Sequence, residues 1–342
     1  MFKDEAEEIE RCLLSLVPLV DHVVLLDTGS SDDSIAIAEN TLKKASITYD
    51  LLEMPFTTYG ECRTFLVERA RQKADWVLMT DADCTIEGTF NPPAKEIGLV
   101  EYINEELVSR IAVFLKSSIP WRYEGKELHE YVTSDVPHAA DRLKGILMKH
   151  HGKSGDTRDT ENDLEILQEL AEAHPDNERW VFYVAQTLKV LGRKEEAIEM
   201  FRQCAAMGND LRLEWVWYSM YQAAILARDP QALLAACQLR PTRAEAPYAL
   251  ACLLGEIGRY DLALPFAKIA SELPEPSDAM YINRPIYVWG GLLEYSMALA
   301  MTGHFSQAQE VNEKLLALDK LPEVARREII ANSAAYPTEA AV

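Results

Sequence analysis

The sequence feature that constrains the fold most is a change in the pattern of apolar and amphipathic segments near residue 160. Before it, short apolar runs alternate with amphipathic segments, at 23–26, 34–44, 47–52, 59–73 and 76–79. From about residue 161 onward, one helical segment follows another. Alternating strands and helices predict an α/β domain with a mostly parallel, Rossmann-like sheet, whose ligands bind at the carboxyl ends of its strands. We expect the polar stretch 150–162 to contain the domain boundary, and we predict domains at 1–155 and 156–342.

A small-residue repeat marks the second half of the chain. Several segments share a small residue followed five positions later by an alanine: Gly192/Ala197, Gly258/Ala263, Gly303/Ala308 and, with alanine first, Ala227/Ala232. The first residue permits a tight turn, and the alanine lets paired helices approach closely. The pattern is typical of tetratricopeptide (TPR) hairpins and predicts an all-α, TPR-like solenoid. The alternative is an unspecific helical bundle.

Composition limits the cell compartment and the partners. The formal charge of −21 argues against passive binding to nucleic acid or to anionic membranes. The six cysteines include no CxxC pair, which indicates reduced thiols rather than a disulfide framework. The acidic start MFKDEAEEIE is unlike a signal peptide, and no apolar run reaches the roughly 18–20 residues of a membrane span. We therefore expect a cytoplasmic protein with no membrane association.

The segment WVLMTDADCT (76–85) contains two aspartates at the end of an apolar strand. Asp81 and Asp83 form the only DxD in the chain. Residues i and i+2 of a strand face the same side, so both carboxylates can converge on one ion. Mg²⁺ and Mn²⁺ prefer oxygen ligands and commonly bind one or two carboxylates together with substrate phosphates. The alternative is a solvated turn with helix-capping aspartates.

Together with other segments, this motif resembles the family 2 glycosyltransferases of GT-A fold. The resemblance is carried by HVVLLDTGSSDDS (22–34), YGECRTFLVERARQKADWVLMTDADC (59–84), WRYEGKELHEYV (121–132) and KHHGKSGDTRD (149–159). The last two are similar to the end of the transferase module in a subgroup with C-terminal TPRs. The resemblance covers nearly the whole chain. It implies inverting, metal-dependent transfer of a sugar from a UDP-sugar donor.

The resemblance also implies which residues form the site. It assigns nucleotide binding to Asp4, Glu5, Asp27, Arg63 and Asp81. It assigns Asp81, Asp83 and a later histidine as ligands of the Mn²⁺ or Mg²⁺ ion. His151 is favoured for that histidine because Gly152 follows it, with His150 and His129 as alternatives. The base that deprotonates the acceptor falls on Glu130, with Glu127 and Asp135 as substitutes.

Two departures from the family pattern stand out. The family begins with a complete strand, of which only Met1 and Phe2 remain here, so the first strand is expected to be truncated. Thr64 stands where the family more often has asparagine. Trp121 and Tyr123 are expected either to stack on a sugar or to pack in the core.

The helical half suggests how an acceptor would bind. TPR arrays present a groove that binds peptides or mediates self-association, so we expect a protein or peptide acceptor, with a homodimer as the other use of the repeats. Two further functions stay open. One is a non-catalytic TPR adaptor with a degenerate transferase domain, and the other is a transferase acting on a glycan or a modified nucleobase. The net charge makes nucleic acid the least expected acceptor.

Overall fold

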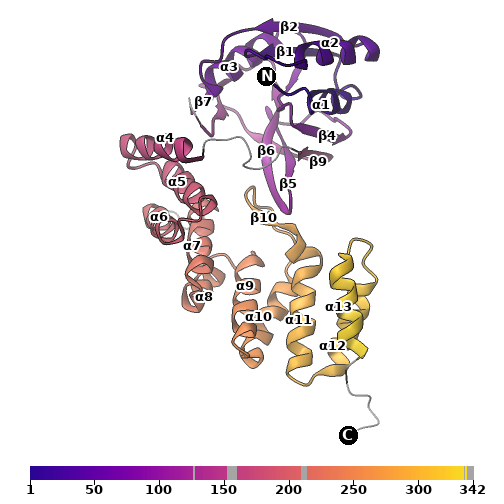
Figure 1. The fold of residues 1–342 in the computed structure, drawn as a ribbon, viewed down its shortest axis with the longest axis vertical. Coiled ribbons are helices and arrows are strands. Elements are labelled where there is room, and N and C mark those ends of the chain that lie inside the picture. Colours follow the sequence, from indigo (N-terminus) through magenta and orange to yellow (C-terminus); the bar gives the residue numbers. More distant parts are fainter. Residues whose placement is uncertain (126–127, 152–159, 209–213, 335, 337–342) are drawn as a thin grey trace. The chain divides into compact units, whose positions relative to one another are not determined.

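The computed structural model describes residues 1–125, 128–151, 160–208, 214–334 and 336. It divides into two compact units, Met1–Asp159 and Thr160–Val342 (Figure 1). The expected domain boundary between residues 155 and 156 lies outside the described residues. The first unit is mixed α/β and the second is helical, which confirms the predicted fold class.

The first part of the N-terminal unit alternates helices and strands as predicted. Its elements are α1 (Ile9–Leu16), β1 (His22–Asp27), α2 (Ser34–Ala45), β2 (Thr48–Glu53), α3 (Tyr59–Ala70) and β3 (Trp76–Leu78). Strands β1 and β2 are parallel and in register from His22–Thr48 to Asp27–Glu53. Helix α2 connects them and brings the chain back to the end of the sheet where β1 begins, so that β2 runs in the same direction. Phe2 forms an isolated parallel bridge to Asp27 on the other edge of β1.

The remaining strands depart from the expected parallel arrangement. They are β4 (Cys84–Gly88), β5 (Ile97–Asn104), β6 (Leu107–Lys116), β7 (Arg122–Glu124), β8 (Tyr131–Thr133) and β9 (Ala140–His150). Strands β6, β5, β9 and β4 lie side by side in that order, β3 pairs with β6, and β7 pairs with β8. Of these pairings only β5–β9 is parallel. Parallel neighbours need long crossover connections, and among the described residues no helix lies between β3 and β9.

Strand β1 is buried on both of its faces. Leu25 packs in a cluster with Leu13 of α1 and Leu42 of α2. The next residue, Leu26, packs in a second cluster with Val67 of α3. Successive side chains of a strand point to opposite faces, so β1 is a central strand with α1 and α2 over one face and α3 over the other.

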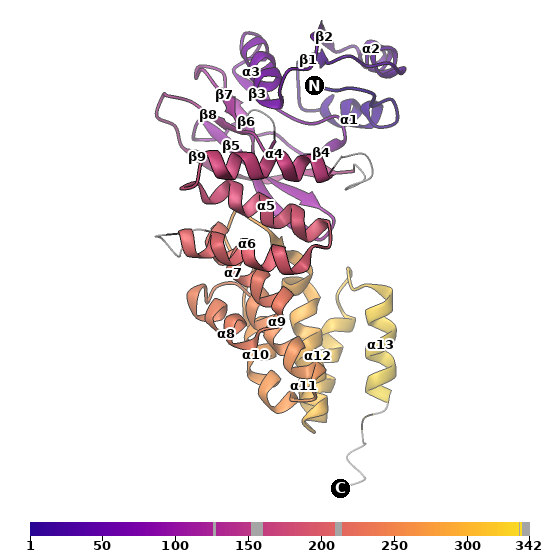
Figure 2. The same ribbon diagram turned by 60° about the vertical axis from the view of Figure 1, so that its left-hand side comes forward.

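The C-terminal unit is built mainly of helices (Figure 2). The helices are α4 (Thr160–Ala173), α5 (Glu178–Val190), α6 (Lys194–Met207), α7 (Glu214–Ala227), α8 (Pro230–Leu239), α9 (Glu245–Glu256), α10 (Tyr260–Glu272), α11 (Gly291–Met301), α12 (Phe305–Leu316) and α13 (Glu323–Ala334). A two-residue extended segment, β10 (Ile282–Asn283), and a turn of π-helix, η1 (Ile286–Gly290), precede α11.

The small-residue repeat has the structural role that its spacing predicts. Gly192, Gly258 and Gly303 adopt left-handed φ angles of 73°, 73° and 81° in the turns between paired helices. The alanines that follow them, Ala197, Ala263 and Ala308, are completely buried in the second helix of each pair. The fourth frame differs because Arg228, rather than Ala227, takes the left-handed φ, at 54°.

Two further expectations concern cysteines and membranes. All six cysteines are free thiols, each buried or half-buried. Across the part of the chain that the structure describes, no helix has the length and apolarity needed to cross a bilayer.

Candidate active site

Asp81 and Asp83 lie in the turn between β3 and β4. The Cys84 amide donates to the Asp81 carbonyl at 3.2 Å and closes this turn. Carboxylate oxygens of both aspartates and the Cys84 sulfur lie within 4.8 Å of one another. The carboxylates therefore converge, as the sequence predicts, although a turn rather than strand alternation brings them together.

Arg63 connects Asp81 to Glu130. Its guanidinium forms an ion pair with the Asp81 carboxylate, and its Nε lies 2.5 Å from Glu130 Oε1. The side chains of Arg63 and Glu130 are each 14% exposed, whereas that of Asp81 is 49% exposed. Partial burial of Asp81 disfavours its ionised form, but the Arg63 guanidinium and other nearby positive groups outweigh it and lower the pKa of the carboxyl group. Arg63 thus holds two sequence-predicted site residues in one place.

The other candidates for the base do not join this group. Asp135 pairs with Arg122 at 3.0 Å, and its side chain is 90% exposed. Glu127 lies outside the described residues. Glu130 is therefore the candidate base that the structure brings beside Arg63 and Asp81.

Helix α3 is tied to the β7 segment through Thr64. Its hydroxyl donates to the Gly60 carbonyl at 2.7 Å and accepts the Tyr123 amide at 2.9 Å. Arg63 lies over the Tyr123 ring, with its guanidinium carbon 5.8 Å from the ring centroid. Trp121 is buried, and its Nε1 donates to the Lys116 carbonyl at 2.8 Å. Trp121 therefore belongs to the core, which removes it as a sugar-stacking residue.

His150 and His151, at the end of β9, make different contacts. His150 Nε2 lies 3.0 Å from Asp83 Oδ2. The His151 ring instead bonds Thr85 Oγ1 at 2.7 Å, and its backbone amide donates to the Asp83 carbonyl at 2.9 Å. In this geometry His150, rather than the favoured His151, faces the acidic turn, because the pairing of His150 with Cys84 turns the His150 side chain toward it. His129 has a left-handed φ of 55° and is outside the described cluster of possible metal ligands.

The predicted nucleotide-binding acids near the N-terminus have separate environments. Asp4 accepts the Ser31 amide at 2.6 Å, and Asp27 is buried and accepts the Gly29 amide at 3.0 Å. Both carboxylates therefore shape the loop after β1. Burial, and then the negative charge of Asp83, raise the pKa of Glu5.

The donor set fits a hard divalent cation. Asp81 and Asp83 offer carboxylate oxygens, and His150 offers an imidazole nitrogen beside Asp83. Cys84 is a poor candidate ligand, although it lies in the same cluster. Its sulfur donates to Asp83 Oδ1 at 3.4 Å, and burial raises the pKa of the thiol, whereas metals bind the thiolate.

One contact was missed in the sequence. Cys12 of α1 is buried, and its thiol donates to the Asp81 carbonyl at 3.4 Å, which links α1 to the acidic turn. Burial raises its pKa to about 12 and keeps it a donor. The sequence carries no signal for this contact, because the two residues are 69 positions apart.

The comparisons with known proteins match the N-terminal part of the chain to a glycosyltransferase family. Residues 1–95 match the model of the family described as glycosyl transferase family 2. The glycosyltransferase SunS of Bacillus subtilis (strain 168) is 20% identical over 218 residues, which cover 58% of this chain and 50% of SunS. The chain thus spans about half the length of this curated relative.

The helical unit has its own relatives. A TPR repeat-containing protein of Synechococcus elongatus is 37% identical over 82 residues, which cover 24% of this chain and 18% of that protein. Among solved structures, MamA matches with a TM-score of 0.38 and 18% identity over 53% of this chain and 87% of MamA. The TPR protein YrrB matches with a TM-score of 0.38 and 16% identity, over 50% of this chain and 81% of YrrB.

These observations define the class of protein. The chain carries a segment of family 2 glycosyltransferase type at its N-terminus and a TPR-like helical unit after it. The acidic turn, Arg63 and the Phe2 bridge all lie at or near the end of β1 or β3, within the part of the N-terminal unit that matches the family.

Proposed function

We propose that this protein is a glycosyltransferase that moves a sugar from a UDP-sugar to an acceptor with the help of Mn²⁺ or Mg²⁺. The observation that carries the proposal is one constellation: the carboxylates of Asp81 and Asp83 converge beside His150, and Arg63 joins Asp81 to Glu130. The family 2 match covers the segment that supplies three of these residues, Arg63, Asp81 and Asp83.

Each side chain has a task in this reaction. Asp81, Asp83 and His150 would hold the cation, which when bound neutralises the diphosphate and stabilises it as it leaves. Arg63 orients Asp81 and keeps Glu130 at the same site. Glu130 takes the proton of the acceptor as the acceptor attacks the anomeric carbon and the bond to the departing UDP breaks on the opposite side. This single displacement inverts the configuration at that carbon. Asp4, Glu5 and Asp27 line the approach of the nucleotide, with the first and last acting through the loop that they hold.

Donor binding tests this proposal directly. We expect UDP and Mn²⁺ together to raise the melting temperature of the protein, because a ligand at 100 times its Kd adds about 2.7 kcal/mol to the free energy of unfolding. That corresponds to a shift of several degrees, at about 2–4 °C per kcal/mol for a unit of this size. Differential scanning fluorimetry without ligand, with UDP alone, with Mn²⁺ alone and with both measures the shift. A folded protein with the same melting temperature in all four conditions contradicts the proposal and favours a non-catalytic adaptor.

The role of Glu130 gives a second test. We expect Glu130→Gln to lower sugar transfer by about 10²–10⁴-fold, because a general base contributes about that factor, while UDP and Mn²⁺ still shift the melting temperature. Asp135→Asn is the matched control, because Asp135 is an exposed acid 90% open to solvent. Wild-type transfer by the Glu130 variant would remove the residue from the reaction.

The acceptor is proposed to be a protein or peptide bound by the TPR-like unit. Helical repeats of this kind bind peptides in their grooves. The charge of −21 disfavours nucleic acid, including a modified nucleobase, as the acceptor. Transfer of labelled sugar to peptide, glycan and RNA pools distinguishes these acceptors, and a homodimer built through the repeats is checked by light scattering.

A further inference from the structure

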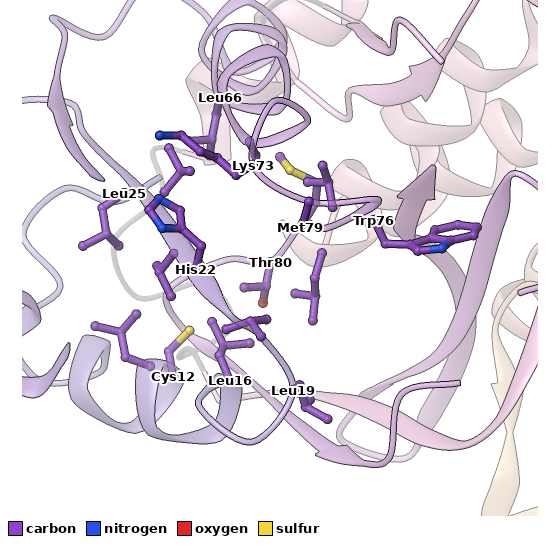
Figure 3. Close-up of a pocket in the computed structure, with 18 of the residues that line it drawn as sticks. Cys12, Leu16, Leu19, His22, Leu25, Leu66, Lys73, Trp76, Met79 and Thr80 are labelled. Carbon is purple, nitrogen blue, oxygen red and sulfur yellow. The ribbon is translucent and has the colours of Figure 1, made fainter. Parts of the chain in front are cut away.

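A cavity in the helical unit has an acidic lining. It has a volume of about 130 Å³ and is bordered by residues of α9, α11, α12 and α13. Its lining includes the carboxylates of Glu294 and Glu328, and none of the described residues that line it is a lysine, arginine or histidine. The larger slot between β1 and β3, of about 300 Å³, is different because mainly apolar side chains such as Leu16 and Leu66 line it (Figure 3).

Glu294 of α11 carries a buried carboxylate with one unsatisfied oxygen. The residue is 5% exposed, and its Oε1 has no hydrogen-bond partner among the described residues. The Cys252 thiol hydrogen-bonds the carboxylate, but burial outweighs this bond and raises the pKa of Glu294. An ionised carboxylate at this position therefore lacks the counter-charge that buried charges normally have.

The Glu294 carboxylate lies between α11 and α9, at the wall of the cavity. A Cβ atom at Gly255 of α9 would lie 3.6 Å from Glu294 Oε1. Residues 248, 252 and 255 are spaced by four and three positions, which places them on one face of α9. Tyr248 of that face and Gly290, one turn before Glu294, both line the cavity. The unsatisfied carboxylate therefore borders an open space rather than a closed core.

Asn312 of α12 fixes the other walls of the cavity. It is 2% exposed, and its side-chain oxygen accepts the hydroxyl of Ser296 of α11. Its Nδ2 donates to Ser333 Oγ at 2.8 Å and to the Tyr336 hydroxyl at 3.3 Å. One side chain thus joins α11, α12 and the end of α13. Because both of its polar atoms are used, Asn312 shapes the cavity, whereas Glu294 Oε1 is left for a ligand.

The size and lining of the cavity favour a single side chain with an apolar stem and a cationic end. A volume of about 130 Å³ is below the roughly 300–1,000 Å³ of sites for drug-sized ligands. Leu293, Met297 and Ile329 supply apolar groups to the walls. Such groups suit the methylene stem of a lysine, which packs on apolar surface while its charged end reaches a polar partner.

An ammonium group fits these acceptors better than a guanidinium does. Arginine binds a carboxylate best through two parallel hydrogen bonds to both of its oxygens. The Cys252 thiol already bonds the Glu294 carboxylate, which leaves Oε1 as the unsatisfied oxygen. The compact ammonium of lysine needs no such fork, and the exposed Glu328 adds a second negative charge to the lining.

We propose that the cavity beside Glu294 binds the lysine side chain of an extended peptide, with the ammonium group donating a hydrogen bond to Glu294 Oε1. This inference rests on the proposed function, because it assumes a peptide acceptor, and it names the residue that the helical unit selects. The bound ammonium supplies the counter-charge that the buried carboxylate lacks. The net charge of −21 also favours the approach of a cationic segment.

A titration with short blocked peptides, followed by methyl NMR, tests the proposal without any donor or metal. The probe is acetyl-Ala-Ala-Lys-Ala-Ala-amide, whose only charge is on the lysine. The matched peptide carries norleucine, which keeps the stem and lacks the ammonium. We expect the lysine peptide to shift the methyl signals of Met297 and Ile329. It should bind at least about tenfold more tightly than the norleucine peptide, because a hydrogen bond to a charged group contributes about that factor or more.

Glu294→Gln separates the proposed contact from general attraction between a cationic peptide and an acidic protein. The variant keeps the shape of the side chain and removes its charge, and we expect it to lose the preference for lysine. Glu310→Gln is the matched control, because it removes the same charge from an exposed position of α12 outside the cavity lining. It should keep the preference. The melting temperature checks that each variant is folded, and Glu328→Gln, at an exposed position, should weaken the preference without disturbing the core.

Several results would overturn the proposal. Equal binding of the lysine and norleucine peptides does so, as do unshifted Met297 and Ile329 methyl signals at millimolar peptide. A lysine preference that survives in Glu294→Gln also overturns it, because the attraction is then general. Tighter binding of the corresponding arginine peptide overturns the choice of an ammonium, and tighter binding of n-butylamine assigns the cavity to a small amine instead. Failure of glycosyl transfer leaves these readouts unchanged, so the two proposals fail independently.

Discussion

Replacing Asp83 by asparagine is expected to abolish turnover of the sugar donor while the protein stays folded. The side chain is 29% exposed and contacts His150 and Cys84, so the fold loses little. The variant removes one of two converging carboxylates, and with it half of the carboxylate charge that would hold a divalent cation. We expect donor hydrolysis to fall by at least about 100-fold, which is about 2.7 kcal/mol of transition-state stabilisation.

Calorimetric titration with Mn²⁺ and a UDP-sugar hydrolysis assay measure both effects. Glu87→Gln is the matched control, because Glu87 lies on β4 with a side chain 55% exposed and pairs with Lys149 at 2.6 Å. We expect the control to bind Mn²⁺ and hydrolyse the donor as the wild type does. Undiminished Mn²⁺ affinity and turnover in the Asp83 variant would exclude this residue as a ligand.

The largest effect on stability is expected in the helical unit at Arg243. This side chain is 1% exposed and bonds Glu245 and Asp278, each at 2.9 Å. It also lies over the Trp217 ring, with its guanidinium carbon 4.5 Å from the centroid. Arg243→Met leaves two buried carboxylates without this partner, which costs about 3–5 kcal/mol of unfolding free energy. At about 2–4 °C per kcal/mol, the melting temperature should fall by about 10 °C.

Arg259→Met is the control for removing an arginine from an ion pair. Arg259 bonds Asp261 at 2.8 Å, but the two side chains are 52% and 60% exposed. Solvent screening limits such a pair to about 0–1 kcal/mol. Urea unfolding followed by circular dichroism gives both values. Equal losses from the two variants would show that burial does not set the strength of the Arg243 cluster.

The pH dependence of the unfolding free energy of the wild type and of Arg243→Met tests whether charge interactions account for the stability of the Arg243 cluster. Burial opposes ionisation of Asp278, but hydrogen bonds from Arg240 and Arg243 outweigh it and lower its pKa. A carboxylate with a lowered folded-state pKa stabilises the fold above its unfolded value near 3.8, and this contribution is lost as pH falls through the folded pKa. We therefore expect the gap in unfolding free energy between wild type and Arg243→Met to stay near its pH 7 value down to about pH 4 and to shrink as the pH falls below about 3.8.

Features of the chain that depend on neighbours in sequence were predictable. The glycine of each repeat lies in a turn with left-handed φ, and the alanine five residues later is buried, because both roles follow from local helix geometry. The convergence of Asp81 and Asp83 was also predictable, because the side chains of two residues separated by one residue can meet in a turn as well as on a strand.

Features that depend on distant pairing were not predictable. His150 rather than His151 faces Asp83, because the register of β9 against β4 sets Cys84 opposite His150. The mostly parallel sheet was expected from the first strands, and the antiparallel pairings of β3, β4, β5 and β6 could not be read from their sequences. Strand direction depends on which edges meet, and edges are not encoded in the period of a single segment.

The sequence by itself determined the order of the two kinds of structure, the turns of the helical repeats and the acidic pair, because each rests on contacts within a few residues. Only the tertiary structure decided that Arg63 joins Asp81 to Glu130, that Cys12 holds the acidic turn and that β1 and β3 leave a slot between them. These features arise where segments distant in the chain pack together, and the packing of the whole unit sets their geometry.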